Sequence, residues 1–262
     1  MPERLFDPRG FPMGADKLDR VRKLLAKAER AATAAEAESY TGKAVELMAR
    51  HGIDTALLAA TQPRSDPIGQ QRIAMQDPYS AGKARMLAWP AAALNCRSVL
   101  HQAWGGKVAA VTVFGHTSDR ERVEMLYTSL LLQATAQLVR VRPPGRGESV
   151  AAYRRSWLHG FAVEVHRRLT AAQERAAAQA TADERATPDT GAPDTGISVA
   201  VVLADRRDRV DRAYAAAFPG LGTARRSTLS GTGFVAGARA GERADLGRGG
   251  RLDTRPRRAV GA

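Results

Sequence analysis

Residues 16–58 read DKLDRVRKLLAKAERAATAAEAESYTGKAVELMARHGIDTALL and predict two antiparallel helices. In the first, at about 17–30, apolar side chains recur at three- and four-residue steps, so they share one side of a helix with 3.6 residues per turn. The opposite side carries four cations, Arg20, Lys23, Lys27 and Arg30. The stretch therefore predicts a helical hairpin with a basic outer face.

The second helix of the hairpin has a start signal and a stop signal. Thr33 and Glu36 have the spacing of a capping box, in which a hydroxyl and a carboxylate satisfy backbone N–H groups of the first turn. Gly52 follows Arg50 and His51, and glycine suits the left-handed residue that ends many helices. We therefore expect Gly52 to stop this helix.

Three segments of the hairpin occur in a recognisable order: RKLLAKA at 22–28, EAE at 36–38 and AVELMARHGI at 44–53. Together they resemble the domain-of-unknown-function family 2786, a small helical module of bacterial and phage proteins. The region that follows resembles, more loosely, the companion domain that often comes after this module. The family has no established activity, so the resemblance implies no reaction and transfers no catalytic residue.

The balance of charge predicts a polyanionic partner. The chain of 262 residues has 40 Lys and Arg against 27 Asp and Glu, a net charge of +13, and such an excess most often serves nucleic acid. A compositional explanation stays open, because only 6 of the 40 cations are Lys, as a GC-rich coding sequence would produce. That bias does not explain why acidic residues are few.

Cysteine usage and hydropathy limit the possible classes of protein. Cys96 is the only cysteine, so neither an internal disulfide nor a cysteine zinc cluster can form, and we expect it to be a small core residue. The N-terminus lacks an apolar signal segment, and no apolar run approaches the length of a membrane span. These features predict a cytoplasmic protein with no membrane contact.

Periodicity along the chain predicts an α+β fold, in which the hairpin precedes a helix-rich domain around a small sheet. The body should contain helices at 80–95, 118–140, 149–182 and 205–218, a β-hairpin at 98–104 and 108–114, and a strand at 198–203. We expect these divisions: an irregular lead-in at 1–15, the hairpin module at 16–58, a linker at 59–79, the body at 80–246 with a mobile loop at 187–196, and a basic disordered tail at 247–262.

Two glycine and serine patterns in the body have structural interpretations. Ser118 and Glu121 have capping-box spacing at the start of a long helix. Gly233, Gly237 and Gly241 recur every four residues, which predicts a helix that approaches its neighbour closely. A dinucleotide fingerprint at 231–236 is rejected, because the polar, glycine-rich residues before it cannot form the strand that the motif requires.

No pattern predicts a catalytic, cofactor-binding or metal-binding residue. His159 and His166 share a helix face, but two turns separate them by about 10 Å, which is too far for one metal ion. No Ser-His-Asp, paired-carboxylate or metal-ligand spacing stands out.

The C-terminal segment offers a second basic surface. Residues 225–262 hold nine Arg against three acidic residues, and the last of these cations are Arg251, Arg255, Arg257 and Arg258. We therefore expect a non-enzymatic accessory protein that contacts the phosphates of DNA or RNA through helix one and this tail. Two alternatives stay open: an enzyme or enzyme subunit with its site in the body, and an interaction module for an acidic protein. The sequence leaves the oligomeric state open.

Overall fold

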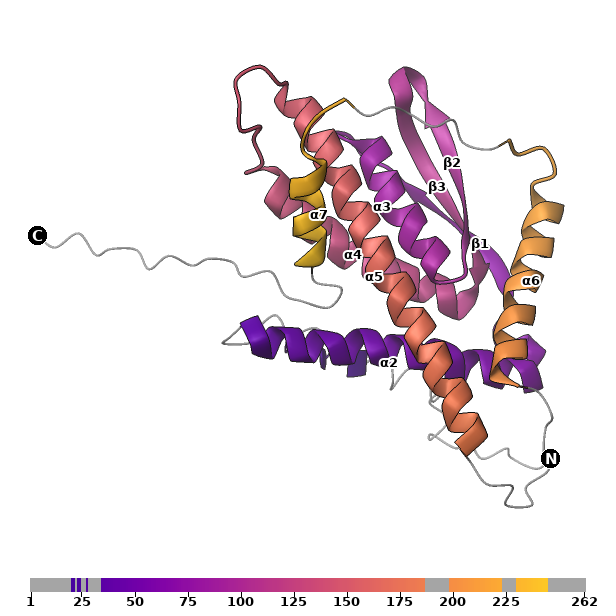
Figure 1. The fold of residues 1–262 in the computed structure, drawn as a ribbon. Coiled ribbons are helices and arrows are strands. Elements are labelled where there is room, and N and C mark those ends of the chain that lie inside the picture. The colour runs from indigo at the N-terminus through magenta and orange to yellow at the C-terminus, as the bar shows by residue number, and fades with distance from the viewer. Residues whose placement is uncertain are drawn as a thin grey trace, which may run out of the picture.

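The computed structural model describes residues 20, 21, 23, 24, 27, 34–186, 198–222 and 230–244. Its elements, in order, are α2 (Ala34–Thr61), η1 (Pro63–Ser65), β1 (Ile68–Ala74), α3 (Ser80–Ala93), β2 (Arg97–Ala103), η2 (Trp104–Gly106), β3 (Lys107–His116), α4 (Thr117–Leu138), α5 (Val150–Ala186), α6 (Val199–Ala217) and α7 (Phe234–Glu242). Helices surround a small antiparallel sheet, so the predicted α+β class is confirmed (Figure 1).

The sheet has the strand order β1-β3-β2, with both pairs antiparallel. The β2–β3 hairpin was predicted, but β1 lies inside the segment that the sequence suggests as a linker. Strand β1 is an edge strand whose polar residues, Gln70 and Arg72, are exposed, so it lacks a clear apolar alternation. Val111 and Val113 of β3 point into the main core, whereas the Phe114 ring lies on the other face, 5.9 Å from that of Tyr214 on α6.

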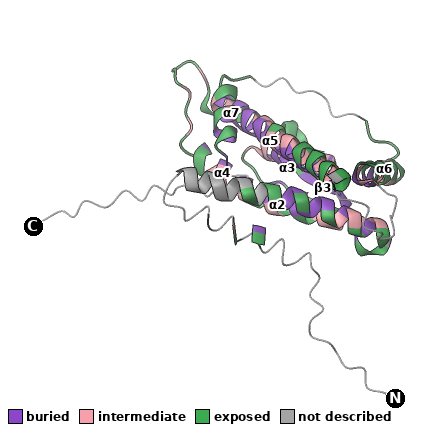
Figure 2. Ribbon diagram, turned by 60° about the horizontal axis from the view of Figure 1, so that its bottom comes forward, coloured by how far each residue is buried: buried purple, intermediate pink, exposed green. Residues whose placement is uncertain are grey.

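The main core lies between the sheet and helices α3, α4 and α5. Most of its largest fully buried side chains come from these helices, from Leu94 directly after α3 and from β3, and Val21 of the first helix joins them: Phe161, Met86, Leu87, Leu94, Leu126, Leu130, Leu158, Leu169, Val111, Val113 and Val21. Helix α5 runs diagonally across the molecule beside α3, and α6 flanks the far side of the sheet (Figure 1). Figure 2 shows buried residues on α3, α5 and the C-terminal part of α2.

The predicted glycine ladder packs one helix backbone against another. Helix α7 lies along α5 (Figure 1), and a Cβ atom built on Gly237 would overlap the carbonyl oxygen of Trp157. In return, a Cβ atom on Gly160 of α5 would overlap the carbonyl oxygen of Phe234. The prediction of a close helix–helix approach is therefore confirmed.

Two expectations about helix boundaries were wrong. Helix α2 continues through Gly52 to Thr61 instead of stopping at the glycine. The segment at 198–203 is the first part of α6 and not a strand, and the buried residues Val199, Val202, Arg206 and Val210 follow the helical period. A short apolar run such as 199–204 does not distinguish a strand from a helix, so its neighbours decide.

The first helix of the module contributes to the same core as the body. Its described positions are helical, and Val21 is fully buried in the same core cluster as Met48 of α2. The turn of the hairpin lies outside the described residues, as do the lead-in 1–15, the loop 187–196 and the tail 247–262. Among the helices that the structure describes, none is long and apolar enough to cross a membrane.

Candidate functional site

The cations of helix one face outward where the structure describes them. Arg20, Lys23 and Lys27 are exposed, while Val21 between them is buried. This confirms the predicted division of the helix into an apolar and a basic side. Arg30 and the four tail arginines, Arg251, Arg255, Arg257 and Arg258, lie outside the described residues. A role for any of these residues in binding stays a prediction.

A further basic surface lies at the connection between α4 and α5. Four exposed arginines occur within 16 residues of sequence, and we call them the α4–α5 arginine cluster: Arg140, Arg142, Arg146 and Arg155. The connection projects from one end of the molecule beside α7 (Figure 1). Half-buried Arg154 fixes the connection, since its Nε donates to the carbonyl oxygen of Val141 at 3.2 Å and its Nη2 to that of Val139 at 2.8 Å.

None of the four clustered guanidinium groups pairs with a carboxylate of the described residues. The one acidic residue in the connection is Glu148, and its carboxylate accepts hydrogen bonds from the backbone N–H of Thr232 at 2.8 Å and from its hydroxyl at 2.7 Å. Arg142 donates to backbone carbonyl oxygens only, at 2.9 and 3.1 Å. The cluster therefore presents four positive charges to solvent, and none of them forms an ion pair with a carboxylate of the described residues.

The arginines around α6 differ, because most of them are paired. Arg209 lies 2.7 Å and Arg212 lies 3.8 Å from carboxylate oxygens of Asp205. Arg97 of β2 forms a two-pronged ion pair with Asp211. On this side of the molecule, exposed arginines therefore have carboxylate partners that the α4–α5 arginine cluster lacks among the described residues.

A buried ionic network of four side chains joins α4, α6 and the residue Asp66 that precedes β1. Asp119 of α4 pairs with Arg122 one turn later and, at 2.9 Å, with Arg206 of α6. Arg206 also donates to Asp66 at 2.6 Å. All four side chains are at most 6% exposed, and their charges cancel. Removing any one partner should lower the stability of the fold, because the remaining charge would be buried and unpaired.

Asp66 caps helix α4 from a distant part of the chain. Its carboxylate accepts from the Ser118 backbone N–H at 2.9 Å and from the Ser118 hydroxyl at 2.7 Å. The predicted capping box of Ser118 and Glu121 is therefore wrong, since the start of α4 uses the carboxylate that precedes β1. Burial by itself raises the pKa of Asp66, but hydrogen bonds from Ser118 and Arg206 outweigh it and hold the pKa below the usual value.

His116 closes the network beside Asp66. Its Nδ1 lies 2.7 Å from the backbone carbonyl oxygen of Asp66, so Nδ1 carries a proton and donates it to that oxygen. Burial is the main cause that lowers the pKa of His116, and the Arg206 charge acts in the same direction. This histidine therefore stays uncharged in the folded protein at neutral pH.

Gly52 makes room for the network. A Cβ atom at this position would overlap the guanidinium group of Arg122, which lies across α2 and donates to the carbonyl oxygen of Met48 at 3.2 Å. Glycine is therefore needed here for close approach and not for a left-handed helix stop. The contact fastens the N-terminal module to α4 of the body.

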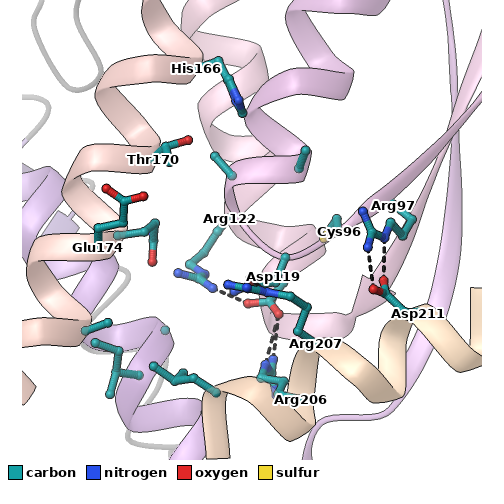
Figure 3. A pocket seen from close by; sticks show the side chains of 18 residues that line it. Cys96, Arg97, Asp119, Arg122, His166, Thr170, Glu174, Arg206, Arg207 and Asp211 are labelled. Atoms are coloured by element: carbon teal, nitrogen blue, oxygen red, sulfur yellow. Dashed lines mark hydrogen bonds and ion pairs between the residues drawn. The ribbon is translucent and has the colours of Figure 1, made fainter. Parts of the chain in front are cut away.

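A cavity of about 430 Å³ lies between α2, α3, α4, α5 and α6 (Figure 3). Arg122, Asp119 and Arg206 form one side of it, and His166, Thr170 and Glu174 line it from α5. The charges of the network are already matched within the protein. Within the described part of the chain, the cavity has polar walls, which include the Nε of Arg122 and the hydroxyl of Thr170 without hydrogen-bond partners, and its buried charges are paired.

Cys96, His159 and His166 make contacts that explain their positions by packing and hydrogen bonding within the fold. Burial raises the pKa of Cys96 to about 12, so its thiol is protonated and a poor nucleophile. The Nδ1 of His166 lies 2.9 Å from the carbonyl oxygen of Trp89, and the ring of His159 packs edge-on against the Trp89 ring. Among the described residues, no group of three His, Cys, Asp or Glu side chains could hold a metal ion.

The arginine cluster can be recognised in the sequence, whereas the buried ionic network cannot. The arginines at 140–155 with their single acidic residue could have been noticed as a charge run. The pairing of Asp66, Asp119, Arg122 and Arg206 leaves no such trace, because up to 140 residues separate the partners. Charge runs report only on exposure, whereas a buried network depends on tertiary contacts.

A comparison with protein families finds a match in the N-terminal segment. Residues 16–55 match the family described as "Protein of unknown function (DUF2786)". The DUF2786 match covers the positions that the sequence resemblance identified. These include Gly52, beside which the Arg122 guanidinium lies, and Met48, whose carbonyl oxygen accepts a hydrogen bond from Arg122. No curated protein and no solved structure gives a significant match to the chain.

Proposed function

We propose that the protein is a non-enzymatic nucleic-acid-binding accessory that holds the phosphate backbone through exposed arginines. The observation that carries the proposal is the absence of any carboxylate partner for the α4–α5 arginine cluster among the described residues. Arg167 and Arg209 are also exposed, but each of them is paired with an acidic residue. The cluster therefore supplies a concentrated positive charge at one end of the molecule.

Phosphate is the group that best suits this surface. A guanidinium group can donate two parallel hydrogen bonds to phosphate oxygens, and its charge releases condensed counterions from nucleic acid. A carboxylate could read base edges by accepting hydrogen bonds from them. The one acidic residue in the α4–α5 connection, Glu148, already accepts hydrogen bonds from Thr232. We therefore expect contacts that position the nucleic acid without selecting its sequence.

The test is to replace all four clustered arginines with Gln in the full chain and measure binding of a labelled DNA duplex by fluorescence anisotropy. Four exposed charge contacts at up to about 1 kcal/mol each predict that affinity falls by about tenfold to several hundredfold. Two unrelated duplex sequences should lose affinity equally.

A matched control removes the same charge from paired positions. The control variant changes four exposed arginines that have carboxylate partners to Gln: Arg50, Arg167, Arg209 and Arg212. Its affinity should fall less than that of the cluster variant. Equal losses would mean that net charge and not the cluster governs binding. Binding of labelled polyglutamate that an acidic protein competes for but DNA does not would favour the acidic-protein alternative.

A further inference from the structure

A tryptophan at the tip of the β2–β3 hairpin is almost entirely exposed. Trp104 is 96% exposed, whereas Trp157 in the core is 3% exposed. Large aromatic side chains normally contribute their area to cores or interfaces. An aromatic ring held in solvent on a hairpin therefore suggests a contact with another molecule.

The hairpin tip is braced while the space around it stays open. Lys107 pairs with Asp77 at 2.7 Å, and the backbone N–H of Val108 donates to the Ser80 hydroxyl at 3.3 Å, so the end of the hairpin is tied to the start of α3. Gly105 and Gly106 turn the chain with φ +72° each, and a Cβ atom on either would meet nothing within 4 Å. A flat ligand could therefore lie beside the ring without a collision with the turn.

The surroundings of Trp104 distinguish between kinds of partner. Its exposed neighbours, Gln102, Ala103 and Lys107, add little apolar area, so the tip is not a hydrophobic patch of the size that protein interfaces or membrane insertion use. A single planar ring suits one nucleic-acid base, because every base has a π-face on which an aromatic side chain can stack. The hairpin tip and the α4–α5 connection lie at the same end of the molecule in Figure 1.

We propose that Trp104 stacks on an unpaired base of single-stranded nucleic acid while the α4–α5 arginine cluster holds the phosphates. This inference rests on the proposed function and names the strand type that the surface takes. Stacking supplies affinity without base-specific hydrogen bonds, so the preference is for single strands over duplexes and not for a sequence.

The test compares Trp104→Ala and Trp104→Phe with the parent in the full chain, using a labelled single-stranded oligodeoxythymidylate as probe. The loss of one stacked base predicts that Trp104→Ala binds roughly 5- to 150-fold more weakly. Its plot of log affinity against log salt should keep the parent slope, because no phosphate contact is removed. Trp104→Phe should retain most of the affinity. Leu132→Ala, which trims an apolar side chain 67% exposed on α4, should bind as the parent does.

A second readout is the intrinsic fluorescence of the ring. The unlabelled oligonucleotide should quench the parent's tryptophan emission, and the quenching should disappear in Trp104→Phe. Because Trp104 is almost fully exposed and Leu132 is exposed, all three variants should melt close to the parent temperature.

The possible outcomes separate this inference from the proposed function. If the parent binds both duplex and single strand, and Trp104→Ala binds each of them with the same affinity as the parent, stacking is refuted while phosphate binding stands. If the parent binds neither probe, the proposed function fails and takes the inference with it. If vesicles of phosphatidylcholine and phosphatidylserine, but not the oligonucleotide, shift the Trp104 emission to the blue, the tip is a membrane contact and stacking is overturned.

Discussion

Replacing Gly52 with Ala sets two opposing effects against each other in helix α2. Alanine favours the interior of a helix over glycine by about 0.8–1.0 kcal/mol. The added methyl group, however, would overlap the Arg122 guanidinium, which is 3% exposed and paired with a fully buried Asp119. Moving it would break the pair and the bond to the Met48 carbonyl oxygen.

The magnitudes decide the sign. Breaking a buried ion pair by displacing one partner costs about 3–5 kcal/mol. Subtracting the helix propensity gain leaves a predicted loss of about 2–4 kcal/mol in the free energy of unfolding for Gly52→Ala. If Gly52 acted as an ordinary mid-helix residue, the same change would stabilise the protein.

The assay is urea denaturation of the parent, Gly52→Ala, Arg122→Met and the double variant. Met is shorter than Arg and lacks the three guanidinium atoms that a Cβ atom at position 52 would meet. In the Arg122→Met background, Gly52→Ala should therefore cost nothing or stabilise slightly. Equal effects of Gly52→Ala in both backgrounds would show that the two residues are not coupled and would refute the assignment of Gly52 to Arg122.

Three further predictions concern stability and pH. Leu24→Ala should lower the free energy of unfolding by about 1–3 kcal/mol, below the 2–5 kcal/mol of a fully buried leucine, because Leu24 is half-buried against the core; a loss near zero in thermal unfolding would mean that helix one does not dock. Gly237→Ala should cost about 1–3 kcal/mol by overpacking α7 on α5, whereas Gly147→Ala, whose Cβ atom meets nothing within 4 Å, should be neutral. Because burial lowers the pKa of His116 below 6.5, the unfolded chain takes up this proton first, so stability should fall as pH drops below about 6.5 and level off below the folded pKa. His116→Gln should lessen that fall in urea titrations at pH 5 to 7. An unchanged pH dependence would show that His116 is not the source of the fall.

Local patterns in the sequence predicted most of the elements. The β2–β3 hairpin was predicted from two strand patterns, at 98–104 and 108–114, with two glycines between them, and the α5–α7 contact was predicted from glycines at four-residue steps. Both signals depend on residues close together in sequence. They survive because the preference that they encode is local and the tertiary structure agrees with it.

The failures occurred where a distant residue decides the structure. Gly52 looks like a helix stop until Arg122, 70 positions later, is seen to occupy the space beside it. Ser118 looks like its own cap until Asp66 supplies the acceptor. The charge balance of the interior could not be predicted either, because each arginine of the network resembles any surface arginine in sequence.

The cations divide in the same way. Helix one showed its basic side through periodicity, and Arg20, Lys23 and Lys27 are exposed as expected. The α4–α5 arginine cluster is equally visible as composition, but the proposal that it binds phosphates depends on the lack of carboxylate partners among the described residues. Pairing of that kind follows from the fold and not from sequence spacing.

The salt dependence of duplex binding is the most direct test of the claim that exposed arginines hold phosphates. If each residue of the α4–α5 arginine cluster neutralises one phosphate, changing all four to Gln should flatten the plot of log affinity against log salt by about 3.6, from 0.9 per contact. The same change at Arg20, Lys23, Lys27 and Arg30 measures the contribution of helix one on the same scale. The four-arginine control at paired positions should leave the slope nearly unchanged. An unchanged slope in the cluster variant, or equal flattening in the control, would contradict phosphate binding by the cluster.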